Sequence, residues 1–324
     1  MYPVEPAKPL NNAQIGRSFF LYTFMKQHFS KTCLTPQQHI TLLNSRGLSI
    51  ADEHKAVSYL TNIGYFRLSA YFYPLLKFPK EAHLYKPEAT FQKVMDMYRF
   101  DRKLRLLIFN EIEKIEVAIR SCITNYASLG SGNLFWLTDK DYFSNETKFQ
   151  ATLAVIRKEI QNSKEDFIAH FADTYLEDYP PAWMITEIIP FGSLNHIYMN
   201  LKDKGLKKKI AQHFGLQTPV FASWLIVLAG LRNICCHHSR MWNRELPISP
   251  TEPKQMKFDW IDSSLTDKRR MYYRICMIRY FLFTVSPNST FKDKLKALLA
   301  AYPNIDTRAM GFPKEGWENE DIWK

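Results

Sequence analysis

The chain has 324 residues, 46% of them hydrophobic, so it is long enough to bury one large core or two smaller ones. Lysine and arginine total 43 against 32 aspartates and glutamates, and the net charge of +11 favours an anionic partner. The five cysteines show no disulfide spacing, no secretory signal is seen, and the longest apolar run is shorter than the roughly 20 residues of a membrane span. We therefore expect a cytoplasmic protein without membrane contact.

The N-terminal third predicts an arm followed by short helices. Residues 1–30 begin with prolines and are expected to form a surface arm. Residues 31–90 are expected to form a small helical region. Its first helix has an N-cap signal at Thr35 and a proline, Pro36, at the first helical position, where the missing N–H costs nothing.

An aromatic cluster follows within residues 63–74 and contains one cation, Arg67. Such clusters are commonly core, but aromatic rings interleaved with a cation also stack nucleic-acid bases. We therefore count Arg67 among the candidate RNA contacts.

The longest helical pattern begins at Thr90 and continues for more than thirty residues, with Asp101 interrupting its apolar face. Opposite charges at four-residue spacing predict solvated pairs such as Glu116 with Arg120. Glu113 and Glu116 could also serve as paired carboxylates, although nothing in the pattern selects them.

Further helices are predicted down to residue 303, after which residues 304–324 are expected to form a C-terminal tail. Glu187 lies in a short apolar segment and, if buried, needs a cation or donor. A basic face at Lys207, Lys208 and Lys209 is commonly solvent-facing, although it could also follow a phosphate backbone. Hairpin dipeptides and Gly-rich nucleotide loops are not seen, so we expect an all-α fold.

The most reactive stretch is residues 231–244, which follows an apolar run that can be the buried half of a helix. It contains adjacent Cys and His pairs, but neighbouring helical residues point in different directions and no second ligand pair follows, which argues against zinc. Either cysteine as a nucleophile is disfavoured by the apolar run. A structural helix end, with His and Arg capping carbonyl groups, remains an alternative.

Helical spacing places Asn233 and His237 on one face, and Arg240 continues that face by one turn. Arg232 lies about 140° from His237 around the helix, so the two do not converge on one small substrate within one copy. Two copies of the helix could bring the arginine of one chain to the histidine of the other. A histidine that moves a proton, an arginine that clamps phosphate and an orienting asparagine suit metal-independent cleavage of RNA by its own 2′-hydroxyl.

The segment from Arg232 to His237 resembles the motif of HEPN-type ribonucleases, in which four to six residues separate Arg from His. Residues 231–244 as a block resemble the Abi family of bacterial abortive-infection proteins, of the AbiD or AbiF type. The blocks at 63–71, 98–105 continuing to 115–120, and 183–194 agree with this likeness. It extends over roughly residues 30–300, and members usually have Ala where this chain has Cys236.

The resemblance implies a HEPN-like helical bundle over residues 91–303, anti-phage defence and a homodimer that needs no cofactor or metal. It also implies a structured noncoding RNA as partner or substrate. Catalysis would then involve Arg232, Asn233 and His237. The expected RNA contacts are His238, Arg240, Arg244, Arg67, Lys207, Lys208 and Lys209. Two alternatives remain, namely an RNA-binding protein without turnover and a scaffold without RNA function.

Overall fold

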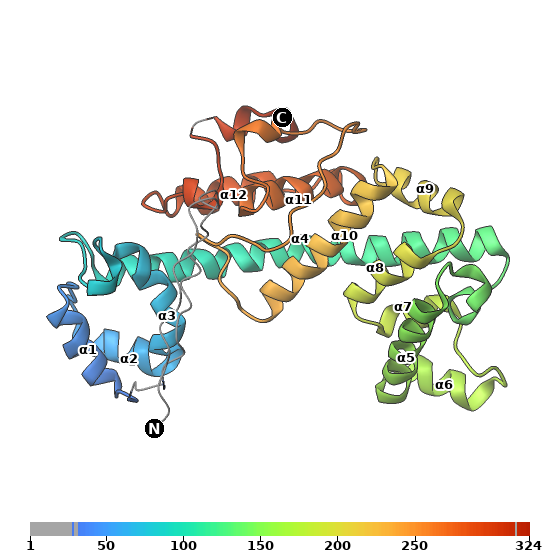
Figure 1. Ribbon diagram of the computed structural model, residues 1–324, viewed down its shortest axis with the longest axis horizontal. Helices are drawn as coiled ribbons and strands as arrows, with labels where there is room; N and C mark the ends of the chain where they lie inside the picture. The colour runs from blue at the N-terminus through green and yellow to red at the C-terminus, as the bar shows by residue number, and fades with distance from the viewer. Residues whose placement is uncertain (1–27, 29–31, 315) are drawn as a thin grey trace, which may run out of the picture.

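The computed structural model describes residue 28, residues 32–314 and residues 316–324 (Figure 1). Within this part of the chain the regular elements are α-helices and short 3-10 helices, and the only β pairing consists of isolated bridges such as Ser49 with Thr90. The all-α prediction is confirmed. The arm expected over residues 1–30 lies almost wholly outside the described residues, and the HEPN-like arrangement stays a prediction.

Helix α4 (Phe91–Ser131) runs through the whole molecule and organises the fold (Figure 1). Its 41 residues correspond to a length of about 60 Å. Thr90 caps it as predicted, with its hydroxyl accepting from the Lys93 amide at 3.1 Å, and Gly132 ends it in the left-handed region. A fully buried stripe explains its length. This stripe consists of Phe100, Leu104, Ile108, Ile112, Ile115, Ile119 and Ile123.

Three N-terminal helices pack at the beginning of α4. They are α1 (Pro36–Ser45), α2 (Glu53–Ile63) and α3 (Tyr65–Phe72). The predicted start of α1 is confirmed, because Thr35 and Gln38 form a reciprocal capping box and Pro36 occupies the first turn. Helix α3 contacts α4 directly, and the hydrophobic core is continuous from α1 into the rest of the molecule. The division at residue 90 stays a prediction.

The middle of the chain supplies further helices, several of which pack against α4. They are α5 (Glu146–Asn162), α6 (Asp166–Thr174), α7 (Ala182–Ile188), α8 (Phe191–Asn200), α9 (Lys204–His213) and α10 (Thr218–Cys236). Helix α10 packs against α4, α8 and α9. It has the length and mean hydropathy, 1.6, of a membrane-spanning helix, but 56% of it is buried inside the fold, as in a core helix.

Helices α11 (Met271–Val285) and α12 (Phe291–Ala300) also pack along α4, which lies below them in Figure 1, and Trp224 of α10 contacts Tyr280 and Phe281 of α11. Residues 304–324, expected as a tail, end in a segment packed against α11. Ile322 and Trp323 are fully buried there, and the Trp323 indole N–H donates to the Tyr272 hydroxyl at 3.2 Å.

Of two expectations for charged residues, the first does not apply and the second is wrong. Glu187 does not need a buried partner, because it lies on the exposed side of α7. The Glu116–Arg120 pair exists at 2.5 Å, but it is mostly buried rather than solvated. The reason is that Arg120 reaches across to the end of α7, where its guanidinium donates to the carbonyl groups of Thr186 and Ile189.

Candidate functional site

Helix α10 presents one side to the core and ends at the candidate site. The predicted buried face is confirmed, since Trp224, Leu228, Leu231 and Cys235 are all buried. The outward side carries Ile226, Gly230, Asn233 and His237, which recur at spacings of four, three and four and therefore form one stripe. We call these four residues the outward stripe. It leaves both Asn233 and His237 open to solvent.

The helix ends at Cys236, earlier than the sequence pattern implied. His237 is the C-cap, and His238 adopts a left-handed φ of 55°. The amide of His238 donates to the Cys235 carbonyl at 3.1 Å, and the amide of Ser239 donates to the Ile234 carbonyl at 3.0 Å. This is the Schellman arrangement, with histidine where glycine is usual. Asn233 and His237 share a face as predicted, but the expectation that Arg240 continues it is wrong because Arg240 lies beyond the turn.

Arg232 lies on the flank of α10 that meets α4. Its Nε is 3.5 Å from Oε2 of Glu116, a contact without hydrogen-bond geometry, and 36% of its side chain is exposed. The other oxygen of Glu116 pairs with Arg120 at 2.5 Å. Glu116 therefore holds Arg232 beside the outward stripe while part of the guanidinium stays accessible.

A buried carboxylate fixes the loop that follows α10. Asp101 is fully buried and accepts from the Tyr71 hydroxyl and from Arg105, each at 2.6 Å. It also accepts from the backbone amides of Met241 at 3.1 Å and Trp242 at 2.7 Å. Burial and the charge of Asp101 raise the pKa of Tyr71, so this hydroxyl remains a donor. The residue that interrupted the apolar pattern is thus the anchor of the site.

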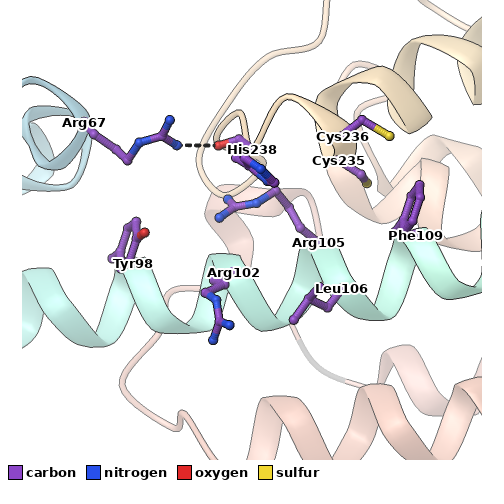
Figure 2. A pocket seen from close by; sticks show the side chains of 9 residues that line it. All are labelled: Arg67, Tyr98, Arg102, Arg105, Leu106, Phe109, Cys235, Cys236 and His238. Atoms are coloured by element: carbon purple, nitrogen blue, oxygen red, sulfur yellow. Dashed lines mark hydrogen bonds between the residues drawn. The ribbon is translucent and has the colours of Figure 1, made fainter. Parts of the chain in front are cut away.

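Two arginines predicted as RNA contacts also hold this loop. Arg67 donates to the carbonyl of His238 at 2.9 Å, as Figure 2 shows, and Arg240 donates to the carbonyl of Ala70 at 3.1 Å. Burial lowers the pKa of Arg240. Arg244 reaches back to the carbonyl of Arg240 at 3.5 Å. These contacts join α3 to the end of α10.

The predicted lysine face lies away from this site. Lys207, Lys208 and Lys209 are on α9, which packs near the start of α10 rather than its end (Figure 1). Lys207 is half-buried and donates to the Met199 carbonyl at 2.8 Å, and burial lowers its pKa. Lys208 and Lys209 are exposed.

Of the two adjacent cysteines, Cys235 is buried and Cys236 is partly exposed. Burial raises the pKa of the Cys235 thiol to about 12, which keeps it protonated near neutral pH. No group of three metal-binding side chains converges within the described ranges.

Sequence reasoning missed the residues that position the site, namely Asp101, Arg105 and Glu116. Arg105 donates to Asp101 and, at 3.2 Å, to the carbonyl of Ser239. The signal that could have identified them was the presence of charged residues on the longest helix at positions next to its buried stripe. The contacts that fix the site join these residues to Arg232 and to backbone groups of the loop after α10, all more than 100 positions away in the chain, so spacing on α4 could not identify them.

Comparison with known proteins gives one match. A family model for Abi-like proteins matches residues 58–243, more than half of the chain. This range begins within α2 and ends in the loop that follows α10, one residue after Trp242, so it includes the outward stripe, Arg232, Glu116 and Asp101. Neither the curated proteins nor the solved structures give a match. Because the matched range spans most of the fold and the whole candidate site, the chain belongs to the family of Abi-like proteins.

Proposed function

We propose that this chain is a metal-independent endoribonuclease that acts as a homodimer in the bacterial cytoplasm, with a structured noncoding RNA as partner or substrate. Membership of the Abi-like family suggests abortive infection, a defence against phage. The net charge of +11 suits an RNA partner. The observation that carries the proposal is the placement of exposed Asn233 and His237 on the outward stripe with Arg232 beside them on an anchored flank.

Each residue has a distinct chemical role. His237 would accept the proton of a ribose 2′-hydroxyl or donate one to the leaving oxygen, since imidazole exchanges protons near neutral pH. Arg232 would bind the scissile phosphate and stabilise the charge that develops on it in the transition state. Asn233, one turn before His237, would orient the imidazole or donate to a phosphate oxygen. The product would carry a cyclic phosphate.

The outward stripe supports the dimer. Glycine inside a helix costs about 1 kcal/mol relative to alanine, and a Cβ placed on Gly230 would meet nothing within 4 Å in the described chain. No contact among the described residues therefore requires glycine at this position, whereas a second helix approaching the stripe would benefit from the missing side chain. Two stripes in contact would bring Arg232 of each copy toward His237 of the other.

The test is RNA cleavage by the purified full chain in the presence of EDTA, compared with His237→Ala. The matched control is the variant His170→Ala, which removes an exposed histidine on α6. We expect wild type and His170→Ala to cleave RNA in EDTA, leaving cyclic phosphate ends, and His237→Ala to be inactive. Equal cleavage by His237→Ala, or cleavage abolished by EDTA, would refute the assignment.

A second candidate is an RNA-binding protein without turnover. The observation in its favour is that Glu116 contacts Arg232, so the guanidinium that would stabilise charge in the transition state is already partly neutralised. In this case wild type and His237→Ala would bind RNA equally tightly and neither would cleave it. An RNA of defined length that copurifies with both proteins would support this alternative.

A further inference from the structure

A cavity of about 440 Å³ lies between α3, α4 and the end of α10 (Figure 2). We call it the basic cavity. It is lined by Arg67, Tyr98, Arg102, Arg105, Leu106, Phe109, Cys235, Cys236 and His238. Arg232 is four residues before Cys236 and shares its flank of α10, so the basic cavity begins about one turn from the proposed phosphate clamp.

The lining is positively charged. Three arginines and a histidine contribute to it, and no carboxylate does. Arg105 is neutralised by its contact with Asp101. Arg67 donates from one terminal nitrogen to the carbonyl of His238, which leaves its other N–H groups free for a ligand. Arg102 is exposed and pairs with no carboxylate among the described residues. Two guanidinium charges therefore remain uncompensated at the cavity.

Aromatic side chains lie at both ends of the charged part. Figure 2 shows Tyr98 beyond Arg102 on one side and Phe109 beyond Leu106 on the other. Their positions on α4 are eleven residues apart, or about 16 Å along the helix. An aromatic face next to an uncompensated guanidinium suits a base joined to a phosphate, because the ring stacks on the base while the guanidinium binds the oxygens.

We propose that the basic cavity is a nucleotide-binding subsite, in which Arg102 binds a phosphate group, Arg67 adds positive charge from α3, and Tyr98 or Phe109 contacts the attached base. The phosphate could belong to an RNA strand that continues to Arg232 or to a free nucleotide that regulates the site. The RNA form rests on the proposed function. Arg102 is the residue that tests the inference, since its side chain donates no hydrogen bond to the described chain, whereas Arg67 also holds the end of α10.

The first experiment measures binding to the full chain carrying His237→Ala, so that cleavage does not interfere. The probes are a fluorescein-labelled hexaribonucleotide, followed by anisotropy, and ATP, followed by calorimetry. Arg102→Gln is compared with Lys103→Gln, which removes the same charge from the next position of α4, where Lys103 faces Tyr302 instead. We expect Arg102→Gln to weaken one probe about tenfold, as for the loss of one charged hydrogen bond. Lys103→Gln should change the affinity less than threefold.

The second experiment uses Cys236, which is partly exposed in the cavity lining, while Cys122, Cys235 and Cys276 are buried. With exposed Cys33 replaced by serine, N-ethylmaleimide should modify Cys236, and the bound probe should slow this modification. Protection by the hexaribonucleotide identifies an RNA subsite, and protection by ATP identifies a free nucleotide.

The inference is overturned if Arg102→Gln and Lys103→Gln bind both probes equally, or if neither probe protects Cys236. Its failure is distinguishable from failure of the proposed function. If cleavage requires His237 but Arg102→Gln does not change the affinity for either probe, only the subsite is refuted. Arg102-dependent binding with protection of Cys236, in a protein that never cleaves RNA, supports the subsite and refutes the nuclease.

Discussion

Replacement of Asp101 by asparagine should loosen the end of α10 and destabilise the whole protein. The carboxylate is fully buried and accepts from four donors, namely Tyr71, Arg105 and the amides of Met241 and Trp242. An asparagine of the same shape offers one acceptor oxygen and turns an NH2 group toward the remaining donors. It also leaves the Arg105 guanidinium, whose side chain is 6% exposed, without a counter-charge.

The size of the effect follows from the lost charge pair. Removing one partner of a buried ion pair costs about 3–5 kcal/mol. The entropy of unfolding is about 2.1 cal/mol/K per residue, which for 324 residues amounts to roughly 0.7 kcal/mol/K. The melting temperature of Asp101→Asn should therefore fall by about 4–7 °C.

Differential scanning calorimetry measures this shift, with Asp96→Asn as the control on the same helix. Asp96 pairs with Arg99 at 3.3 Å, but both side chains are about 40% exposed, so the control should change stability by less than about 1 kcal/mol. If Asp101→Asn melts within 1 °C of wild type, the carboxylate does not hold the loop and Asp101 does not position the site.

Two further variants test the proposed dimer contact and the proposed role of Arg232. Gly230→Leu should convert the proposed dimer to a monomer in sedimentation experiments without loss of helical circular dichroism, because a Cβ at this position meets no atom within 4 Å among the described residues. An unchanged dimer would show that the outward stripe is not the contact. Glu116→Gln should reduce RNA turnover on the order of tenfold to a hundredfold through misplacement of Arg232. Exposed Glu113→Gln serves as its control, and faster turnover by Glu116→Gln would instead show that the carboxylate competes with substrate.

Helix starts were predictable from the sequence because their signals are local. Thr35 and Thr90 each cap a helix within three residues of their own position, and the apolar repeat of α4 specifies its length. The end of α10 was not predictable in the same way. The usual signal is a glycine in the left-handed region, but His238 occupies that position, so the pattern continued past the true end to Arg240.

The sequence allowed the shared face of the candidate residues to be predicted, but not the hydrogen-bond partners that surround them. Asn233 and His237 share an exposed face, as helical spacing indicated. By contrast, Arg67 and Arg240 were selected for their charge, and the structure shows them bound to backbone carbonyl groups. Asp101 was the interruption in an apolar pattern, and its partners Met241 and Trp242 lie 140 and 141 residues away. Such pairings depend on tertiary packing, which spacing within one helix does not reveal.

The early end of α10 also separates two adjacent histidines. His237 completes the outward stripe, whereas His238, one residue later and in the left-handed conformation, lines the basic cavity. The carbonyl of His238 is the group that Arg67 holds, so a change at Arg67 disturbs both the cavity and the position of His237. Arg102 lines the same cavity without holding the loop. A loss of RNA binding in Arg102→Gln with the melting temperature unchanged would therefore assign the effect to ligand contact, whereas the same loss in Arg67→Gln would not.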